Sequence, residues 1–208
     1  LGVMLLEVET HELESPAYRR NDGTRCFHCK DTLFSTIEDK VLKQHHITAV
    51  AYGENSDDTK APDRPGQQAA AKHRVLRPLS DAGLDKAAVR RIAHALGIPV
   101  AEKPASPCLA SRIAPFTDVT AEKLGRVEAV EDAVLELGFT DVRVRHFGEA
   151  SARIELPEAQ LHLAAQDAIR KQIVDAAHAA GFIHVSLSME GLRSGSMSAN
   201  LLNSPHVA

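Results

Sequence analysis

Several features that would define a protein class are missing from this 208-residue sequence. It contains no apolar run of about 18 residues, so no transmembrane helix is predicted. Residues 1–9 show neither the basic region nor the cleavage pattern of a signal peptide. Acidic residues (28) outnumber Lys and Arg (24), and this balance argues against nucleic acid or an anionic membrane as a general partner.

Cysteine is also scarce. The count is three, and an odd number argues against a disulfide framework. Without a signal peptide, free thiols are typical of a reducing compartment, so we predict a cytoplasmic protein. A chain of this length, with 44% hydrophobic residues, can bury a core without disulfides.

The first half of the sequence alternates strand and helix signals. Apolar runs predict strands at residues 1–8 and 47–52, and helical spacing predicts a helix at 31–44. Asp85 is a suitable N-cap for a further helix that ends at Gly97. Such alternation favours the α/β class with a parallel sheet.

A proline-rich loop at residues 103–116 separates the chain into predicted domains 1–115 and 116–208. In the second domain, Thr120 can cap a long helix that ends at Gly138. Strand signals at 141–146, 153–156 and 184–187, with a helical stretch at 157–180, then predict a small α+β domain.

The sharpest chemical signal is the Cys-X-X-Cys segment formed by Cys26 and Cys29, because two thiolates at this spacing can clasp one metal or cluster. Cys108 is the remaining cysteine. Three thiolates suit a [4Fe–4S] cluster, and with a fourth ligand such as His28 they suit zinc. The alternative is that Cys26 and Cys29 are incidental thiols or a redox pair and that Cys108 is a packed apolar residue.

Arginines mark the other candidate sites. Arg112, with Ser111, follows Cys108 closely, and a nearby guanidinium stabilises a reactive thiolate; the alternative is an exposed arginine. Arg143 and Arg145 share one face of a predicted strand and could clamp a phosphate or carboxylate, or simply face solvent. Arg193 lies in a glycine-flanked loop, 191–197, that could wrap an anion or be a plain turn.

Taken together, successive segments resemble the LarE family of ATP-dependent sacrificial sulfur transferases, which belong to the PP-loop, or N-type ATP pyrophosphatase, superfamily. The resemblance runs in order from about Val8 to Leu201. It is carried by the strings RCFHCKDTLF, DRPG, RPLSDAGLDKAAVRRIAHALGIPV, KPASPCLASRI, GFTDVRVRHFGEASARIELPE and GLRSGSMS.

The resemblance implies an incomplete PP-loop domain, similar to adenine nucleotide alpha hydrolases, followed by a C-terminal domain for substrate binding and oligomerisation. In the three-cysteine members, Cys26, Cys29 and Cys108 would hold a [4Fe–4S] cluster that carries the sulfur to be donated. Ser111 and Arg112 match family residues beside that cysteine. The positions that match substrate and phosphate contacts are Arg143, Arg145, Glu155 and Arg193.

The implied reaction belongs to the biosynthesis of the nickel-pincer nucleotide cofactor, which serves lactate racemase. ATP, with Mg²⁺, adenylates a carboxylate of a pyridinium mononucleotide; sulfur then displaces AMP and leaves a thiocarboxylate. Arginines would stabilise the substrate phosphate and the developing charge. Family members assemble into hexamers, so a homo-oligomer is expected.

One family element is missing. An SGGxDS loop, whose backbone N–H groups cradle pyrophosphate, binds ATP in the family, and these 208 residues contain no Gly-Gly pair. We therefore expect an N-terminal truncation of two βα units, roughly 60–80 residues. The alternatives are a non-catalytic metal-binding remnant or subunit, or a protein similar to tRNA thiolases, which the acidic balance disfavours.

The missing loop leads to a first prediction. The 208-residue chain should not convert ATP to AMP and pyrophosphate, because it has no backbone cradle for the phosphates. The measurement is AMP formation by chromatography, with a protein-free reaction as control. AMP formed above that control would contradict the prediction.

Overall fold

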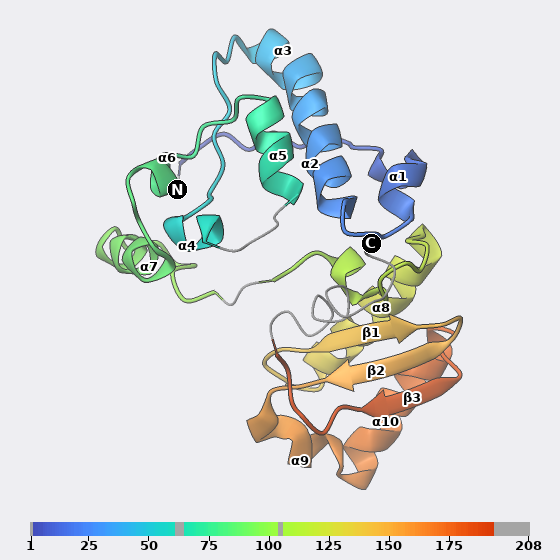
Figure 1. Ribbon diagram of the computed structural model, residues 1–208. Helices are drawn as coiled ribbons and strands as arrows, with labels where there is room; N and C mark the ends of the chain where they lie inside the picture. Colours follow the sequence, from blue (N-terminus) through green and yellow to red (C-terminus); the bar gives the residue numbers. More distant parts are fainter. Residues whose placement is uncertain (1, 61–64, 104–105, 194–208) are drawn as a thin grey trace. The chain divides into compact units, whose positions relative to one another are not determined.

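The computed structural model describes residues 2–60, 65–103 and 106–193. The chain forms two compact units, one of residues 1–18 and 24–106 and the other of residues 19–23 and 107–208 (Figure 1). We call them unit 1 and unit 2. The chain passes between them within the proline-rich loop, ahead of the predicted boundary at residues 115 and 116. None of the helices in the described ranges is long and apolar enough to cross a membrane.

Unit 1 is built from helices. The described elements are η1 (Glu12–Glu14), α1 (Pro16–Arg19, at the border with unit 2), α2 (Arg25–Thr36), the π-helical η2 (Ile37–Leu42), α3 (Lys43–His45), α4 (Ser56–Thr59), α5 (Pro65–Lys72), α6 (Pro78–Asp81) and α7 (Lys86–Ala95). The predicted helix at 31–44 is therefore part of a longer helical run that begins at Arg25. Asp85 caps α7 as predicted: its Oδ1 accepts from the Ala88 N–H at 2.6 Å.

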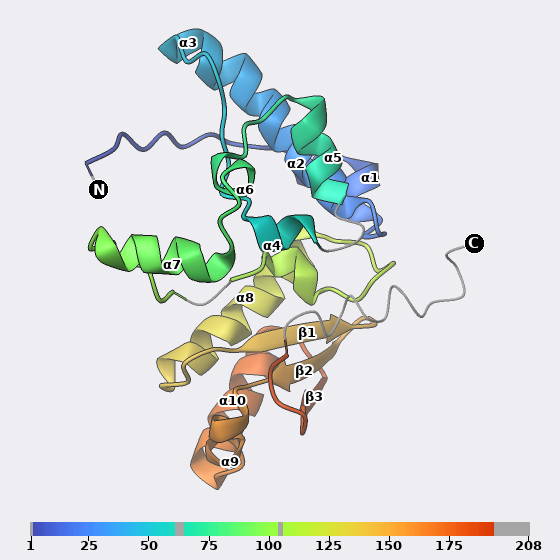
Figure 2. The same ribbon diagram turned by 60° about the vertical axis from the view of Figure 1, so that its left-hand side comes forward.

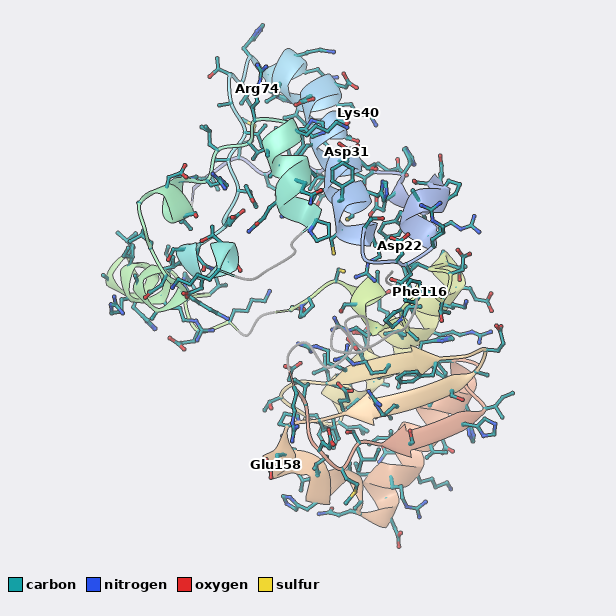
Figure 3. The ribbon with its side chains drawn as sticks, in the orientation of Figure 1. Asp22, Asp31, Lys40, Arg74, Phe116 and Glu158 are labelled. Carbon is teal, nitrogen blue, oxygen red and sulfur yellow. The ribbon has the colours of Figure 1, made fainter. Side chains whose placement is uncertain are left out.

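The core of unit 1 lies between α2 and α5. Phe34 on α2 packs with Ala69 and Ala70 on α5 and with Val75. His73, directly after α5, lies between Asp31 (2.8 Å) and Glu38 (2.9 Å), which come from α2 and η2. Figure 3 labels Asp31 on its helix. Burial lowers the pKa of His73, but its hydrogen bonds to the two carboxylates outweigh burial, so the net pKa is raised.

The strands predicted for unit 1 are mostly not formed in its described part. The strand predicted at 1–8 is wrong for residues 2–8, where Val3, Met4 and Leu5 are at least 77% exposed. The strand predicted at 47–52 is reduced to one parallel bridge between Ala51 and Leu76. An apolar run becomes a buried strand only where other strands pair with it, and the described part of unit 1 supplies this one bridge. The PP-loop sheet stays a prediction.

Unit 2 is an α+β unit in the predicted order. The described elements are η3 (Leu109–Arg112), α8 (Ala121–Glu136), β1 (Arg143–Phe147), β2 (Ser151–Glu155), η4 (Glu158–Gln160), α9 (Leu161–Ala164), α10 (Asp167–Ala179) and β3 (His184–Leu187). Strands β1 and β2 pair antiparallel, and β2 and β3 pair parallel. Helices α8 and α10 cover one face of this mixed sheet (Figures 1 and 2). Thr120 caps α8 as predicted, through the Lys123 N–H.

Alternation along β1 divides the sheet into two chemically different faces. Val144 and His146 pair with Ile154 and Ala152 of β2 on the face that contributes to the apolar core. That core includes Val127, Val130 and Val134 from the inner stripe of α8. The opposite, polar face carries arginines of β1 and β2.

His146 is an unusual member of the core. It is fully buried, its ring meets the Phe182 ring edge-on at 5.3 Å, and neither ring nitrogen has a hydrogen-bond partner. Burial, with the nearby Lys123 and Arg126 charges, lowers the pKa of His146. The folded protein therefore disfavours the protonated form of His146.

We predict that His146→Leu stabilises the protein, most strongly in mild acid. Above the unfolded pKa of about 6.5, His146 is neutral in both states and does not make stability depend on pH. Below it, the unfolded chain binds a proton at His146 more readily than the folded chain does, so wild-type stability falls. Urea unfolding at pH 5 and pH 8 should show a larger gain at pH 5, with the exposed His178→Leu as control. An equal effect at both pH values would contradict this explanation.

Candidate functional site

The two cysteines of the Cys-X-X-Cys segment lie near the N-terminal end of α2. Side chains three positions apart share one side of a helix, and here Cys26 is exposed and Cys29 half-buried. His28, the candidate fourth zinc ligand, stacks edge-on against Phe27 at 5.3 Å. Cys108 belongs to unit 2, where it is exposed directly before η3. All three are described residues, and none forms a disulfide.

Within either unit, the described residues contain no group of three His, Cys, Asp or Glu side chains arranged to hold a metal. Cys26 and Cys29 supply two sulfur donors from one helical turn of unit 1, and Cys108 supplies the third from unit 2. The chemistry of this donor set suits a soft metal or an iron–sulfur cluster. The assignment of a cofactor stays a prediction.

Arg112 anchors the Cys108 loop from inside the protein. Its Nε and Nη2 donate to the two carboxylate oxygens of Glu131 on α8, at 2.9 and 3.1 Å. Its Nη1 donates to the carbonyls of Pro107 and Cys108 and to Ser111 Oγ. The alternative of an exposed arginine is wrong, because Arg112 is only 2% exposed. Its hydrogen bonds position the Cys108 backbone and do not reach the sulfur.

Glu131 ties this loop to the sheet. Besides the bidentate pair with Arg112, its Oε1 accepts from the backbone N–H of Val144 on β1 at 2.9 Å. One buried carboxylate therefore joins η3, α8 and β1. A buried carboxylate is retained only where charges and hydrogen bonds compensate its desolvation, and Glu131 has both.

Arg145 makes a second connection between the loop and the polar sheet face. Its Nε and Nη2 both lie 2.9 Å from Glu155 Oε2, and its Nη1 donates to the carbonyl of Ser111 at 3.1 Å. Arg145 and Glu155 are both buried. This pairing brings three predicted site residues, Ser111, Arg145 and Glu155, into one network.

Arg143 lies on the same sheet face and pairs with Asp141 just before β1. It is 7% exposed and Arg145 is 5% exposed, so the expectation that these arginines simply face solvent is wrong. Sequence alternation placed them on the same face correctly. It could not show that acids and the Cys108 loop would cover them.

Arg193 stands apart from this network in the described structure. It is exposed and lies 3.9 Å from Glu190. The segment before it is well anchored: Leu192 N–H donates to the Leu156 carbonyl at 2.8 Å. Gly191 has φ +75° and approaches Glu158, labelled in Figure 3, so closely that a Cβ would lie 3.3 Å from the Glu158 Cβ. Residues 194–197 of the predicted anion loop lie outside the described residues.

Three residues of this site were not predicted from the sequence: Glu131, Asp141 and Arg153. Glu131 had a usable signal, because it lies four positions after Val127 and beside Val130 on the inner stripe of α8. A carboxylate on an apolar stripe requires a buried partner. Arg153 is directly opposite Arg145 in the β1–β2 pair and donates to Glu155 at 2.9 Å.

We predict that Glu131→Ala destabilises the protein by about 3–5 kcal/mol, because it leaves the buried Arg112 charge without its counter-ion. Urea unfolding measures the change. The matched control is Glu128→Ala on the exposed side of the same helix, which should change stability little. Unchanged unfolding of Glu131→Ala would show that the Arg112 pair does not stabilise the unit.

The chain is similar to two curated bacterial proteins, whereas no protein-family model matches it. It is 37% identical over 197 residues to the uncharacterized protein slr1717 of Synechocystis, covering 95% of this chain and 72% of that protein. It is 32% identical over 203 residues to the pyridinium-3,5-bisthiocarboxylic acid mononucleotide synthase of Lactiplantibacillus plantarum, covering 97% of this chain and 71% of that protein. With this identity and coverage, the chain belongs to the LarE-type family of sulfur transferases.

Proposed function

We propose that this chain transfers sulfur to a carboxylate of a pyridinium mononucleotide and forms a thiocarboxylate for the nickel-pincer nucleotide cofactor. The name of the Lactiplantibacillus relative supports this substrate class. The observation that carries the proposal is that Arg145, on the arginine-rich sheet face, donates to the Ser111 carbonyl of the loop whose Cys108 backbone Arg112 holds. A sulfur-bearing residue thus lies in a segment fastened to the cations that an anionic substrate needs.

The roles of the arginines follow from their contacts. Arg143 and Arg145, with Arg193, would bind the substrate phosphate, since guanidinium groups pair with phosphate in a planar, bidentate way. Glu155 would orient Arg145 by accepting two of its N–H groups. Arg112 is best understood as a positioning residue, because its donors hold the backbone around Cys108. The Ser111 hydroxyl, hydrogen-bonded to Arg112, would face the reacting group.

We further propose that Cys26, Cys29 and Cys108 together hold a [4Fe–4S] cluster, with zinc as the alternative. When bound, the cluster would supply a deprotonated sulfide as the sulfur to be donated. The three cysteines would act as its ligands, and the Arg112 contacts would keep the Cys108 backbone in a fixed conformation. Exposure of Cys26 and Cys108 leaves both thiols accessible for ligation.

Activation of the carboxylate needs ATP. In that step the carboxylate oxygen bonds to the α-phosphorus of ATP and pyrophosphate leaves. In the next step a C–S bond forms while the C–O bond to AMP breaks, and AMP departs with the electron pair. Because the 208 residues contain no Gly-Gly pair, we propose that they provide sulfur transfer and substrate binding, and that adenylation requires a phosphate loop that they do not contain.

The cluster proposal is tested by anaerobic purification. The protein should be brown, absorb visible light and contain iron and acid-labile sulfide. Replacing Cys26, Cys29 or Cys108 by Ser should abolish the colour, because each removes one thiolate ligand. His28→Ala is the discriminating control: it should keep the colour of a cysteine-held cluster but lose zinc from a site that uses His28. A colourless wild-type protein with stoichiometric zinc would contradict the iron–sulfur proposal.

A further inference from the structure

Arg153 occupies an unusual place on the polar face of the unit 2 sheet. It is directly opposite Arg145 in the antiparallel β1–β2 pair, so the two guanidinium groups emerge on the same face. Like charges directly opposite each other destabilise a sheet. Retaining both therefore requires negative charge close to the pair.

Two carboxylates among the described residues pair with the arginines of this face. Arg143 has its own partner in Asp141, whereas Arg145 and Arg153 share the single carboxylate of Glu155. Arg145 uses Oε2 of Glu155, and Arg153 uses Oε1. These five residues carry three positive and two negative charges.

Arg153 also has hydrogen-bonding capacity that Glu155 does not use. Only its Nη2 donates to Glu155, while its Nε is buried without an acceptor. The exposed part of the guanidinium therefore has N–H groups, besides the one bonded to Glu155, that can donate to an oxyanion. The guanidinium lies over the Phe147 ring at 4.9 Å, which fixes its plane.

The Arg153 side chain remains accessible. This side chain is 37% exposed, whereas the side chain of Arg145 is 6% exposed. A ligand from solvent can therefore contact Arg153 more readily than the buried Arg145 beside it. Preorganised by Phe147 and Glu155, Arg153 loses little side-chain entropy when an anion binds.

We propose that Arg153 is an anion-binding residue that, beside Arg145, takes one oxyanion of the ligand and sets specificity for it. The inference rests on the proposed function for the substrate class but assigns a residue that the proposed site does not include. The oxyanion is either the phosphate or the ring carboxylate of a pyridine mononucleotide. Either group can accept hydrogen bonds from the N–H groups of a guanidinium.

Calorimetric titration of the full chain with three probes tests this inference. Nicotinic acid mononucleotide carries phosphate and carboxylate, nicotinamide mononucleotide carries phosphate only, and nicotinic acid carries carboxylate only. Arg153→Gln should weaken binding of nicotinic acid mononucleotide about tenfold or more, as expected for a lost charged hydrogen bond. Whether nicotinamide mononucleotide or nicotinic acid is weakened as well identifies the oxyanion. Arg170→Gln, which removes an exposed arginine of α10, is the matched control and should bind as wild type.

A second variant separates binding from folding. Arg153→Lys keeps the charge next to Glu155 but lacks the planar fork, so it should bind with intermediate affinity at an unchanged melting temperature. Wild-type affinity in Arg153→Gln would overturn this inference alone and leave the proposed function standing. Failure of the wild type to bind any of the three probes would overturn both this inference and the proposed substrate site.

Discussion

The buried ion pair between Arg112 and Glu131 is the contact on which the rest of unit 2 depends. Arg112 donates hydrogen bonds to Glu131 and to the carbonyls of Pro107 and Cys108. Glu131 also accepts a hydrogen bond from the backbone N–H of Val144 on β1. The pair thereby connects the cysteine loop, α8 and the sheet. Because both groups are desolvated, neither can lose its partner without a large cost in free energy, and this fixes the geometry of the loop.

The two faces of the sheet in unit 2 differ in their side chains. The face toward α8 and α10 is apolar, and burial lowers the pKa of its histidine, His146. The other face concentrates guanidinium groups, held in place by Asp141 and Glu155. Because side chains alternate along β1, one short strand supplies both the core and the cationic surface.

Local signals were sufficient for much of the fold. The caps at Asp85 and Thr120 were predictable because a cap is formed by residues only three positions apart. The strands of unit 2 followed from alternation over a few residues. Residues 2–8 and 47–52 carry equally good strand signals and form no regular strand, because a strand also requires neighbours, which the described part of unit 1 supplies only as the bridge at Ala51.

The sequence by itself determined the family, the helices and strands of unit 2, and which arginines share a sheet face. Only the tertiary structure decided that Arg145 pairs with Glu155, 10 residues away, and holds Ser111, 34 residues away. It also decided that Arg112 is buried against Glu131 and that Arg153 shares an acid with Arg145. The periodicity of a strand shows on which face of the sheet a side chain lies. Which group a charged side chain pairs with depends on distances that are set by packing between segments far apart in the sequence.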